Sequence, residues 1–284
     1  MHPFQSQEYR GLFVRHFIPN TSQLVEDFFE LLSDKRAVFI GMKPVLNGQE
    51  LTDFGDIPSP SKERVKEYCD NLKKMHGATS VQFDYVREDS PLFQILSHIS
   101  SAAPLQQAVS PFIMLPNSWE QYLKSLERTD RKELKRKLKR LGSVPYAVQY
   151  ADRTNLNAFE EFVKLHRLSD VSKKQFMSEK MKSFFYDLYT LPIPSWHTKL
   201  AFLEIEHTPA AVVYYFENDE ELLLYNSGYD PGYKQYSAGF LLFAYLIKDA
   251  IANGKKRLDF LRGNERYKYD LGGKDRKLYQ FIIT

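Results

Sequence analysis

Hydrophobic and polar positions follow two recurring patterns along this chain. Apolar residues spaced three or four apart predict helices, and short apolar runs bounded by turn residues predict strands. We expect helices at about 22–32, 61–75, 91–101, 118–141, 155–167, 178–191 and 237–253. We expect strands at 37–42, 51–54, 81–86, 199–206, 210–217, 221–225, 258–261 and 277–283, with a hairpin turn at Asn47-Gly48. This alternation predicts a mixed α/β fold.

The order of elements in the second half is specific. A meander of three strands is followed by a loop, a helix at 237–253 and a short strand that we expect to return parallel. The helix begins with the small residues Ser237, Ala238 and Gly239, which would let an anion approach the N–H groups of its first turn. An ordinary capped helix accounts for the same residues.

Composition narrows the class of protein. The chain has 284 residues, which is long for one globular domain and comfortable for two. Its 43% hydrophobic and 26% charged residues exclude disordered and rod-like proteins. The one cysteine, Cys69, excludes an internal disulfide framework and a cysteine zinc site. The longest apolar run, 239–247, is far shorter than the roughly 20 residues of a membrane span. No secretory signal pattern stands at the start, so we expect a cytoplasmic protein without a membrane span.

Charge is concentrated in two segments. Residues 124–140 hold nine basic and three acidic residues, and residues 255–277 hold nine and four. Such focal patches suit a small polyanion better than a general nucleic-acid surface. The first patch lies on the helix expected at 118–141, where three interpretations stay open. It is a solvated helix face, a contact for the nucleotide end of a cofactor, or a surface for transfer RNA phosphates.

Four segments, taken in order, resemble the carboxyl half of GNAT-type acyltransferases. They are residues 225–230, 234–239, 254–258 and 259–268. More narrowly, they resemble a branch of cellulose- and exopolysaccharide-associated acetyltransferase-like proteins that is similar to the Fem-type peptidoglycan transferases. The basic run at 115–136 and the segment at 53–56 resemble the same branch. The resemblance covers about residues 35–284.

The resemblance implies an α/β (α+β mixed sheet) fold of two tandem GNAT-like domains joined by a basic helix. We expect the domains at 1–117 and 142–284, with the connector at 118–141 and the active site in the second domain. In this family a splayed strand pair admits the pantetheine arm of an acyl-coenzyme A, and the following helix start binds its pyrophosphate. An amine or hydroxyl acceptor then attacks the thioester directly, without a metal.

Three functions remain open under this resemblance. The first is acyl-coenzyme A-dependent N- or O-acyl transfer, with acetyl-coenzyme A or another acyl-coenzyme A as co-substrate and a sugar or cell-envelope precursor as acceptor. The second is Fem-type transfer from aminoacyl-tRNA. The third is a non-catalytic binding module with a closed cofactor cleft.

Site residues are carried over position by position. Lys234 takes the place of the family's usual Gln or Arg, Ser237 that of the first glycine and Gly239 that of the second. Ser237 is a departure from the family pattern. The expected cofactor-binding residues are Lys234, Ser237, Ala238, Gly239 and Phe240.

Each catalytic or substrate-binding candidate has a structural alternative. Asp259 would orient or deprotonate the acceptor, or pair with Arg262; Tyr267 would protonate the leaving thiolate, or pack. His166 would be a base, or a core histidine. The substrate-binding candidates, which a turn or a solvated loop also explains, are Tyr229, Asp230, Arg262, Glu265 and Lys268. His197 and His207 lack metal-ligand spacing and are expected at the surface.

Overall fold

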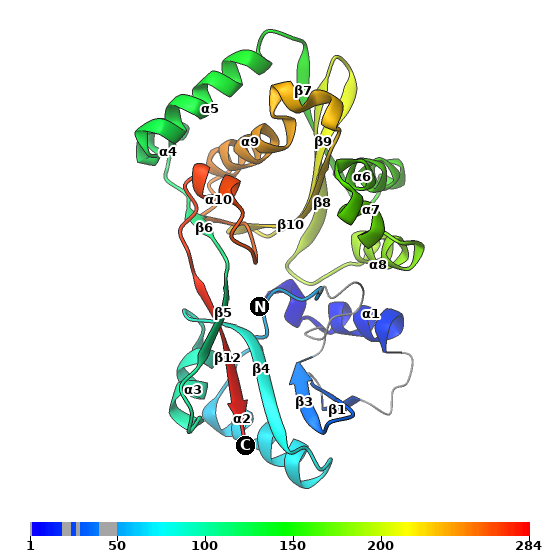
Figure 1. Cartoon of the computed structure of the whole chain (residues 1–284), viewed down its shortest axis with the longest axis vertical. Helices are drawn as coiled ribbons and strands as arrows, with labels where there is room; N and C mark the ends of the chain where they lie inside the picture. The colour runs from blue at the N-terminus through cyan, green and yellow to red at the C-terminus, as the bar shows by residue number, and fades with distance from the viewer. Residues whose placement is uncertain (1, 19–23, 27–28, 40–49) are drawn as a thin grey trace. The chain divides into compact units, whose positions relative to one another are not determined.

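The computed structural model describes residues 2–18, 24–26, 29–39 and 50–284. It divides into two compact units, residues 1–110 with 275–284, and residues 111–274. Each unit contains a mixed sheet that is six-stranded in the described part of the chain. The prediction of a mixed α/β fold is therefore confirmed (Figure 1).

The first unit has the strand order β1-β2-β3-β4-β12-β5. Its strands are β1 (Leu24–Glu26), β2 (Phe29–Leu31), β3 (Arg36–Phe39), β4 (Ser80–Arg87), β5 (Leu105–Val109) and β12 (Lys277–Ile283). Its helices are η1 (Pro3–Gln5), α1 (Gln7–Phe17), α2 (Lys62–Lys74) and α3 (Pro91–Ile99). Ser61 and Ser90 cap α2 and α3 by accepting hydrogen bonds from backbone N–H groups.

The second unit has the strand order β6-β11-β10-β9-β8-β7. Its strands are β6 (Phe112–Met114), β7 (Tyr146–Asp152), β8 (His197–Ile205), β9 (Thr208–Glu217), β10 (Glu221–Tyr229) and β11 (Arg257–Asp259). Its helices are α4 (Trp119–Ser125), α5 (Arg128–Leu141), α6 (Leu156–Ser169), α7 (Val171–Phe176), α8 (Glu179–Thr190), η3 (Pro231–Tyr236), α9 (Ala238–Ala252) and α10 (Arg266–Asp270).

Helices cover both faces of the second sheet. The apolar helix α9 packs on one face together with Leu134 and Leu141 of α5, while α6 and α8 lie on the other (Figure 1). The β10–β11 pair is parallel and the β8–β9–β10 meander is antiparallel, as the order of elements predicts. This arrangement places the end of β10, the start of α9 and the end of β11 in one sheet region.

Several expectations need correction. The helix expected at 22–32 is wrong, because its described residues form β1 and β2, which pair with each other and with β3. Residues 51–54 form no strand: Leu51 and Phe54 are buried without ladder pairing. The expected hairpin turn at Asn47-Gly48 lies outside the described residues. At 22–32, strand pairing between segments adjacent in the sequence overrides the helical spacing of the apolar residues.

The basic helix is part of the second unit rather than a connector between units. It is two helices, α4 and α5, and Leu126 between them is buried in the core of that unit. The carboxyl-terminal strand β12 lies between β4 and β5 of the first unit. The unit boundaries therefore differ from those expected at 117, 118–141 and 142. In the described residues, no helix is long and apolar enough to cross a membrane.

Candidate active site

The pairing between strands β10 and β11 ends midway along β10. Their parallel pairing runs from Glu221 with Arg257 to Leu223 with Asp259 and ends there, although β10 continues to Tyr229. The next residue of the β11 chain, Phe260, donates its N–H to Pro111 on the β6 side. A register shift between Leu224 and Asn226 marks a bulge in β10 at the same level. The result is a wedge that opens past the Leu223–Asp259 pair.

Asp259 lies at the apex of this wedge. It is fully buried, and its Oδ1 accepts a hydrogen bond of 2.8 Å from the Leu261 N–H. Leu261 itself has a φ of 58°, a backbone conformation that costs free energy for a branched residue and is held here by that bond. Asp259 thus orders the loop that leaves β11, in addition to its expected role toward an acceptor.

Lys268 makes its hydrogen bonds and its ion pair within its own loop. Its Nζ donates to the carbonyl oxygens of Leu261, Arg262 and Gly263 at 3.0–3.2 Å and forms an ion pair of 2.9 Å with Glu265. The ammonium is only 2% exposed, so it organises the loop from inside. Glu265 is exposed and Arg262 is half-buried, so these two candidates reach the surface of the loop that Lys268 holds.

Tyr267 packs in an aromatic cluster. Its ring stacks on Phe243 with centroids 4.9 Å apart and meets Phe260 edge-on. Burial raises the pKa of Tyr267, with a further contribution from Glu265. A tyrosine with a raised pKa stays protonated and can donate a hydrogen bond to a leaving group, but it transfers its proton less readily.

The start of α9 is flanked by cations from α5. Ser237 adopts the left-handed conformation, with φ 55° and ψ 43°, which explains why glycine suits this position. Lys137 Nζ donates to Ser237 Oγ at 3.0 Å and lies 5.2 Å from the centre of the Phe240 ring. Arg140 donates to the Gln235 carbonyl at 2.9 Å. Positive charge and helix N–H groups therefore converge at this turn.

The remaining expected binding residues surround this turn. Gly239 and Ala238 lie in the first turn of α9, and a Cβ on Gly239 would stand 3.8 Å from Tyr229. Tyr229 is 39% exposed at the end of β10. Asp230 caps η3 by accepting a hydrogen bond from the Gly232 N–H, and Lys234 is exposed on η3. The structure thus brings Tyr229 and the helix start together.

Side chains from the α6–α7 corner bind the edge of β10 that faces away from β9. Lys173 Nζ donates to the Ser227 carbonyl at 2.6 Å, and the Tyr229 N–H donates to Ser169 Oγ at 2.8 Å. The Ser227 N–H donates to Asn226 Oδ1 at 2.8 Å. In a GNAT-type site this is the edge along which a pantetheine arm would pair.

His166 is a core residue in this structure. It is 1% exposed, packed between the rings of Phe162 and Phe176. Burial lowers the pKa of His166 to about 3, with Lys173 acting in the same direction and a hydrogen bond with Asn226 opposing it. The ring is therefore neutral at physiological pH. It is also inaccessible from solvent, so a substrate cannot contact it in this conformation.

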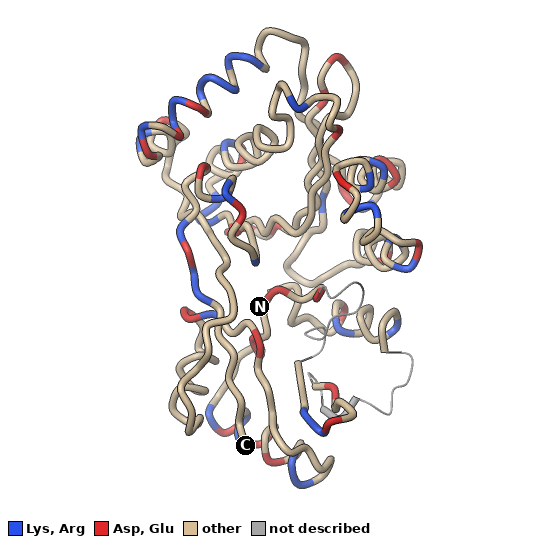
Figure 2. The backbone as a smooth tube through the Cα atoms, in the orientation of Figure 1, with Lys and Arg blue, Asp and Glu red and all other residues tan. Residues whose placement is uncertain are grey.

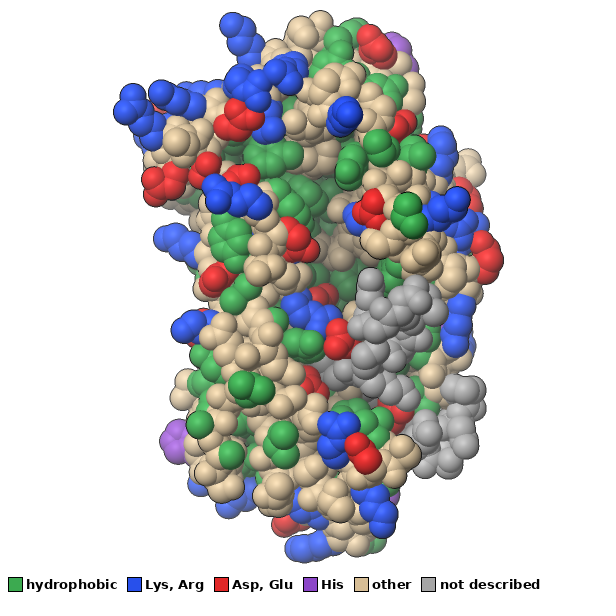
Figure 3. All heavy atoms as spheres, viewed as in Figure 1, with side chains coloured by type: hydrophobic (Ala, Val, Ile, Leu, Met, Phe, Trp, Pro, Cys, Tyr) green, Lys and Arg blue, Asp and Glu red, His purple; other side chains and the backbone are tan. Residues whose placement is uncertain are grey.

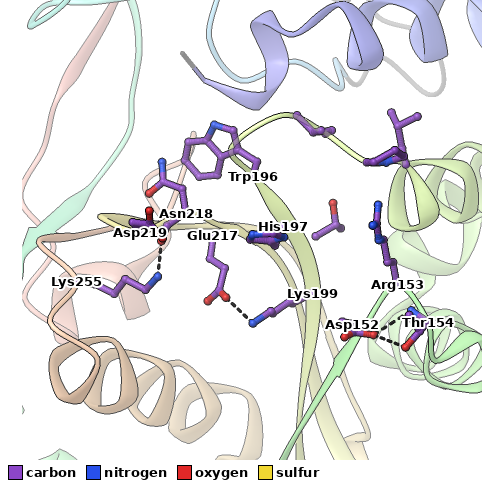
Figure 4. A pocket seen from close by; sticks show the side chains of 14 residues that line it. Asp152, Arg153, Thr154, Trp196, His197, Lys199, Glu217, Asn218, Asp219 and Lys255 are labelled. Carbon is purple, nitrogen blue, oxygen red and sulfur yellow. Dashed lines mark hydrogen bonds and ion pairs between the residues drawn. The ribbon is translucent and has the colours of Figure 1, made fainter.

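A pocket of about 610 Å³ lies elsewhere, at the opposite end of the sheet (Figure 4). Trp196, His197, Lys199 and Glu217 line it, and none of the site residues expected from the sequence does. Its Lys199 and Glu217 form an ion pair with each other, so they offer no convergent set of donors. It lies by the start of β10, about 20 Å along the strand from Ser227 at 3.3 Å per residue. The wedge, which holds the expected site residues, is therefore the candidate site.

Sequence reasoning missed Lys137, Ser169 and Lys173. All three make hydrogen bonds at the site to residues that are far away in the sequence. Local residue spacing cannot predict such contacts. For Lys137 one signal was available, because it belongs to the basic helix that has an interpretation as a cofactor contact. Together the wedge, its buried carboxylate and the cationic helix start can hold a phosphate-bearing donor with its acyl group between β10 and β11.

Several solved structures have a fold similar to that of this chain. The structure of L-PGS from Bacillus licheniformis has a TM-score of 0.61 at 13% identity, covering 98% of this chain and 92% of that one. The C-terminal domain of a putative lysylphosphatidylglycerol synthetase from Agrobacterium fabrum has a TM-score of 0.59 at 8% identity, covering 87% and 77%. FemX has a TM-score of 0.57 at 12% identity, covering 90% and 83%. At these identities the similarity shows the fold alone.

The family is shown by sequence. Comparison with curated proteins finds no match. The acetyltransferase (GNAT) domain matches residues 128–269, which is half of the chain and contains the wedge and the start of α9. The chain therefore belongs to the acetyltransferase (GNAT) domain family and is an acyltransferase.

Proposed function

We propose that the second unit transfers an acyl group directly from an acyl-coenzyme A to an amine or hydroxyl, with a sugar or cell-envelope precursor as the acceptor. The observation that carries this proposal is the parting of β10 and β11 beside the start of α9. A pantetheine arm fits between parted strands, and the α9 N–H groups with Lys137 suit its diphosphate. No enzyme nucleophile is required, because the acceptor attacks the thioester itself.

In this proposal, each group of site residues has a separate role. Lys137, Ser237, Ala238, Gly239 and Phe240 form the diphosphate end, with Lys234 at its rim. Asp259 is fully buried in this structure, so it positions the acceptor through the loop that it orders. Tyr267 donates a hydrogen bond to the leaving thiolate. Arg262 and Glu265, on the loop that Lys268 holds, face the acceptor together with Tyr229 and Asp230.

Binding of acetyl-coenzyme A tests this proposal. A ligand at about 100 times its dissociation constant stabilises the folded state by about 2.7 kcal/mol, so we expect a clear rise in melting temperature. The Lys137→Met variant should lose most of that rise and the Lys132→Met variant, on the exposed face of the same helix, should keep it. Release of free thiol from acetyl-coenzyme A with glucosamine or glucose then measures transfer. If no acyl-coenzyme A gives either stabilisation or thiol release, this donor is refuted.

A second candidate is transfer from aminoacyl-tRNA, which two observations favour. Lys173 and Ser169 already bind the β10 edge along which a pantetheine would pair. Basic residues also recur along α5 (Figure 2), and their side chains gather over this helix (Figure 3), with Arg128, Lys132, Lys135 and Lys139 exposed. The structures of similar fold include L-PGS and FemX.

Retention of tRNA tests the second candidate. Binding should weaken with added salt, because each phosphate contact releases counterions. Replacing Lys135, Arg136 and Lys139 by Glu should abolish it, while the same change at Lys180, Lys182 and Lys248 should not. Unchanged retention in the α5 variant would exclude this surface. Tests with acetyl-coenzyme A and with tRNA on one preparation separate the two donors.

A further inference from the structure

The free edge of β10 lacks the backbone donors that a carbonyl group would need there. Because the Asp230 N–H bonds to Ala210 on β9, residues 227 and 229 direct their backbone groups away from β9. The N–H of Ser227 is bound to Asn226 Oδ1, and that of Tyr229 to Ser169 Oγ. Both donors at these two positions are therefore engaged before any substrate arrives.

Lys173 lies at the same edge, and its ammonium has hydrogen-bond donors that are not used there by the described residues. Its ammonium donates one hydrogen bond, to the Ser227 carbonyl at 2.6 Å. An ammonium carries three donors, and within the described residues no acceptor is found for the other two. The α6–α7 corner fixes it there, since Asp170 caps α7 and Ser169 binds β10.

The surroundings of Lys173 strengthen its electrostatic action. The side chain is partly buried, and this burial lowers the pKa of Lys173, while Asp170 and Glu265 act in the opposite direction. A charge in a partly dehydrated site interacts more strongly with a developing charge than one in bulk water. Lys173 also lies on the β10 side of the wedge, whereas the loop carrying Glu265 follows β11.

We propose that Lys173 Nζ donates a hydrogen bond to the carbonyl oxygen of the acyl donor and holds the negative charge that develops on it. In this step the acceptor amine or hydroxyl forms a bond to the carbonyl carbon, and the π electrons move to that oxygen. Collapse restores the C=O bond and breaks the bond to the leaving thiolate or ribose oxygen. The proton that the acceptor loses equals the one the leaving group gains, so no further reagent is needed.

This assignment rests on the proposed direct transfer in the wedge and holds for either donor. The first measurement is kcat and KM of Lys173→Met against the unmodified protein, using whichever donor supports turnover. Loss of one oxyanion donor lowers kcat by about 100- to 1,000-fold, and we expect KM to change far less. Lys174→Met, the exposed neighbour on α7, should leave both constants unchanged.

Chemical rescue separates catalysis from a structural role. Alkylating Lys173→Cys with bromoethylamine rebuilds an ammonium at nearly the same position, and we expect it to restore at least a tenth of the lost kcat. The native Cys69 is buried and burial raises its pKa to about 11, so it should resist the reagent. Lys174→Cys treated in the same way is the matched control.

A spectroscopic readout does not depend on turnover. The ketone analogue of acetyl-coenzyme A, in which a CH₂ replaces the sulfur, keeps the carbonyl but cannot react. Its carbonyl stretch should shift to lower frequency in the unmodified protein and return in Lys173→Met. If the protein uses aminoacyl-tRNA, an aminoacyl ketone analogue of the tRNA 3′ end replaces this probe.

The outcomes are distinguishable. A kcat within threefold of the unmodified protein in Lys173→Met, or a kcat that stays low after aminoethylation of a folded Lys173→Cys, overturns the assignment and leaves the proposed function standing. Absence of turnover by the unmodified protein with both donor classes refutes the proposed function, and the assignment of Lys173 with it.

Discussion

At the scale of single residues, His166 shows how burial sets a charge state. Its pKa is lowered to about 3 from an ordinary 6.5, mainly by burial. Between these values the unfolded chain takes up a proton that the folded protein does not, so stability falls as the pH drops below 6.5. For one such group, we expect a loss of about 1.4 kcal/mol between pH 7.5 and 5.5.

The matched variants isolate this contribution. His166→Asn should remove most of the pH dependence, while His197→Asn, at an exposed position, should retain it. Urea unfolding midpoints at the two pH values give the comparison. Equal pH dependence in all three proteins would contradict a neutral, buried His166.

Residue roles were only partly predictable from the sequence. The motif around Asp259 identified the loop that leaves β11, because its composition is unusual for a simple turn. The sequence did not indicate which residues of this loop are structural and which reach its surface. That distinction depends on the buried Lys268, which donates hydrogen bonds to three carbonyl groups. Lys173 was invisible for the same reason: its meaning comes from a β10 carbonyl 54 residues away.

At the scale of elements, the α6–β10 contact depends on one glycine. A Cβ built on Gly228 would lie 2.4 Å from the His166 backbone nitrogen and 2.6 Å from the Leu165 carbonyl carbon. These are backbone atoms, so Gly228→Ala must push α6 away from β10. Overpacking of this kind costs about 1–3 kcal/mol, and we expect a melting temperature several degrees lower.

The control is another glycine of the same unit. Gly142→Ala places its Cβ 3.4 Å from the nearest atom and should change the melting temperature little. Because Ser169 and Lys173 follow His166 on the displaced corner, Gly228→Ala should also reduce transfer more than binding of the diphosphate end. A variant as stable as the unmodified protein would show that α6 and β10 are not in such close contact.

Regular elements with strong periodicity were predicted well, and pairings were not. The helices α2, α3, α6 and α8 have their expected places because cap residues and apolar spacing agree. Helix α9 has its expected place through its apolar residues, since Ser237 makes no side-chain cap hydrogen bond there. Strands β5, β6 and β7 have no regular alternation of buried and exposed residues. They are therefore recognisable as strands only from their pairing with neighbouring strands. The segment at 22–32 failed for the converse reason, since its apolar residues fit helical spacing while neighbouring strands were available.

At the scale of the whole molecule, the chain enters the second unit after Ser110 and returns to the first after Lys274. The last strand, β12, joins β4 and β5, which would otherwise lack a common neighbour. No pattern within residues 275–284 indicates which sheet they join, because an amphipathic strand fits either. The sequence therefore predicted the strand itself and assigned it to the other domain.

Phe281 provides the test of this return. Its side chain is 1% exposed in the core of the first unit, with its ring 5.4 Å from that of Phe93, whereas the adjacent Ile282 is 41% exposed. Phe281→Ala should cost about 3–5 kcal/mol, and Ile282→Ala should cost far less. Hydrogen exchange should show protection lost in β4 and β5 and kept in β8, β9 and β10, because these strands share no sheet with β12. Loss of protection across both sheets would mean that the two units unfold as one, and that β12 supports the catalytic sheet as well as its own.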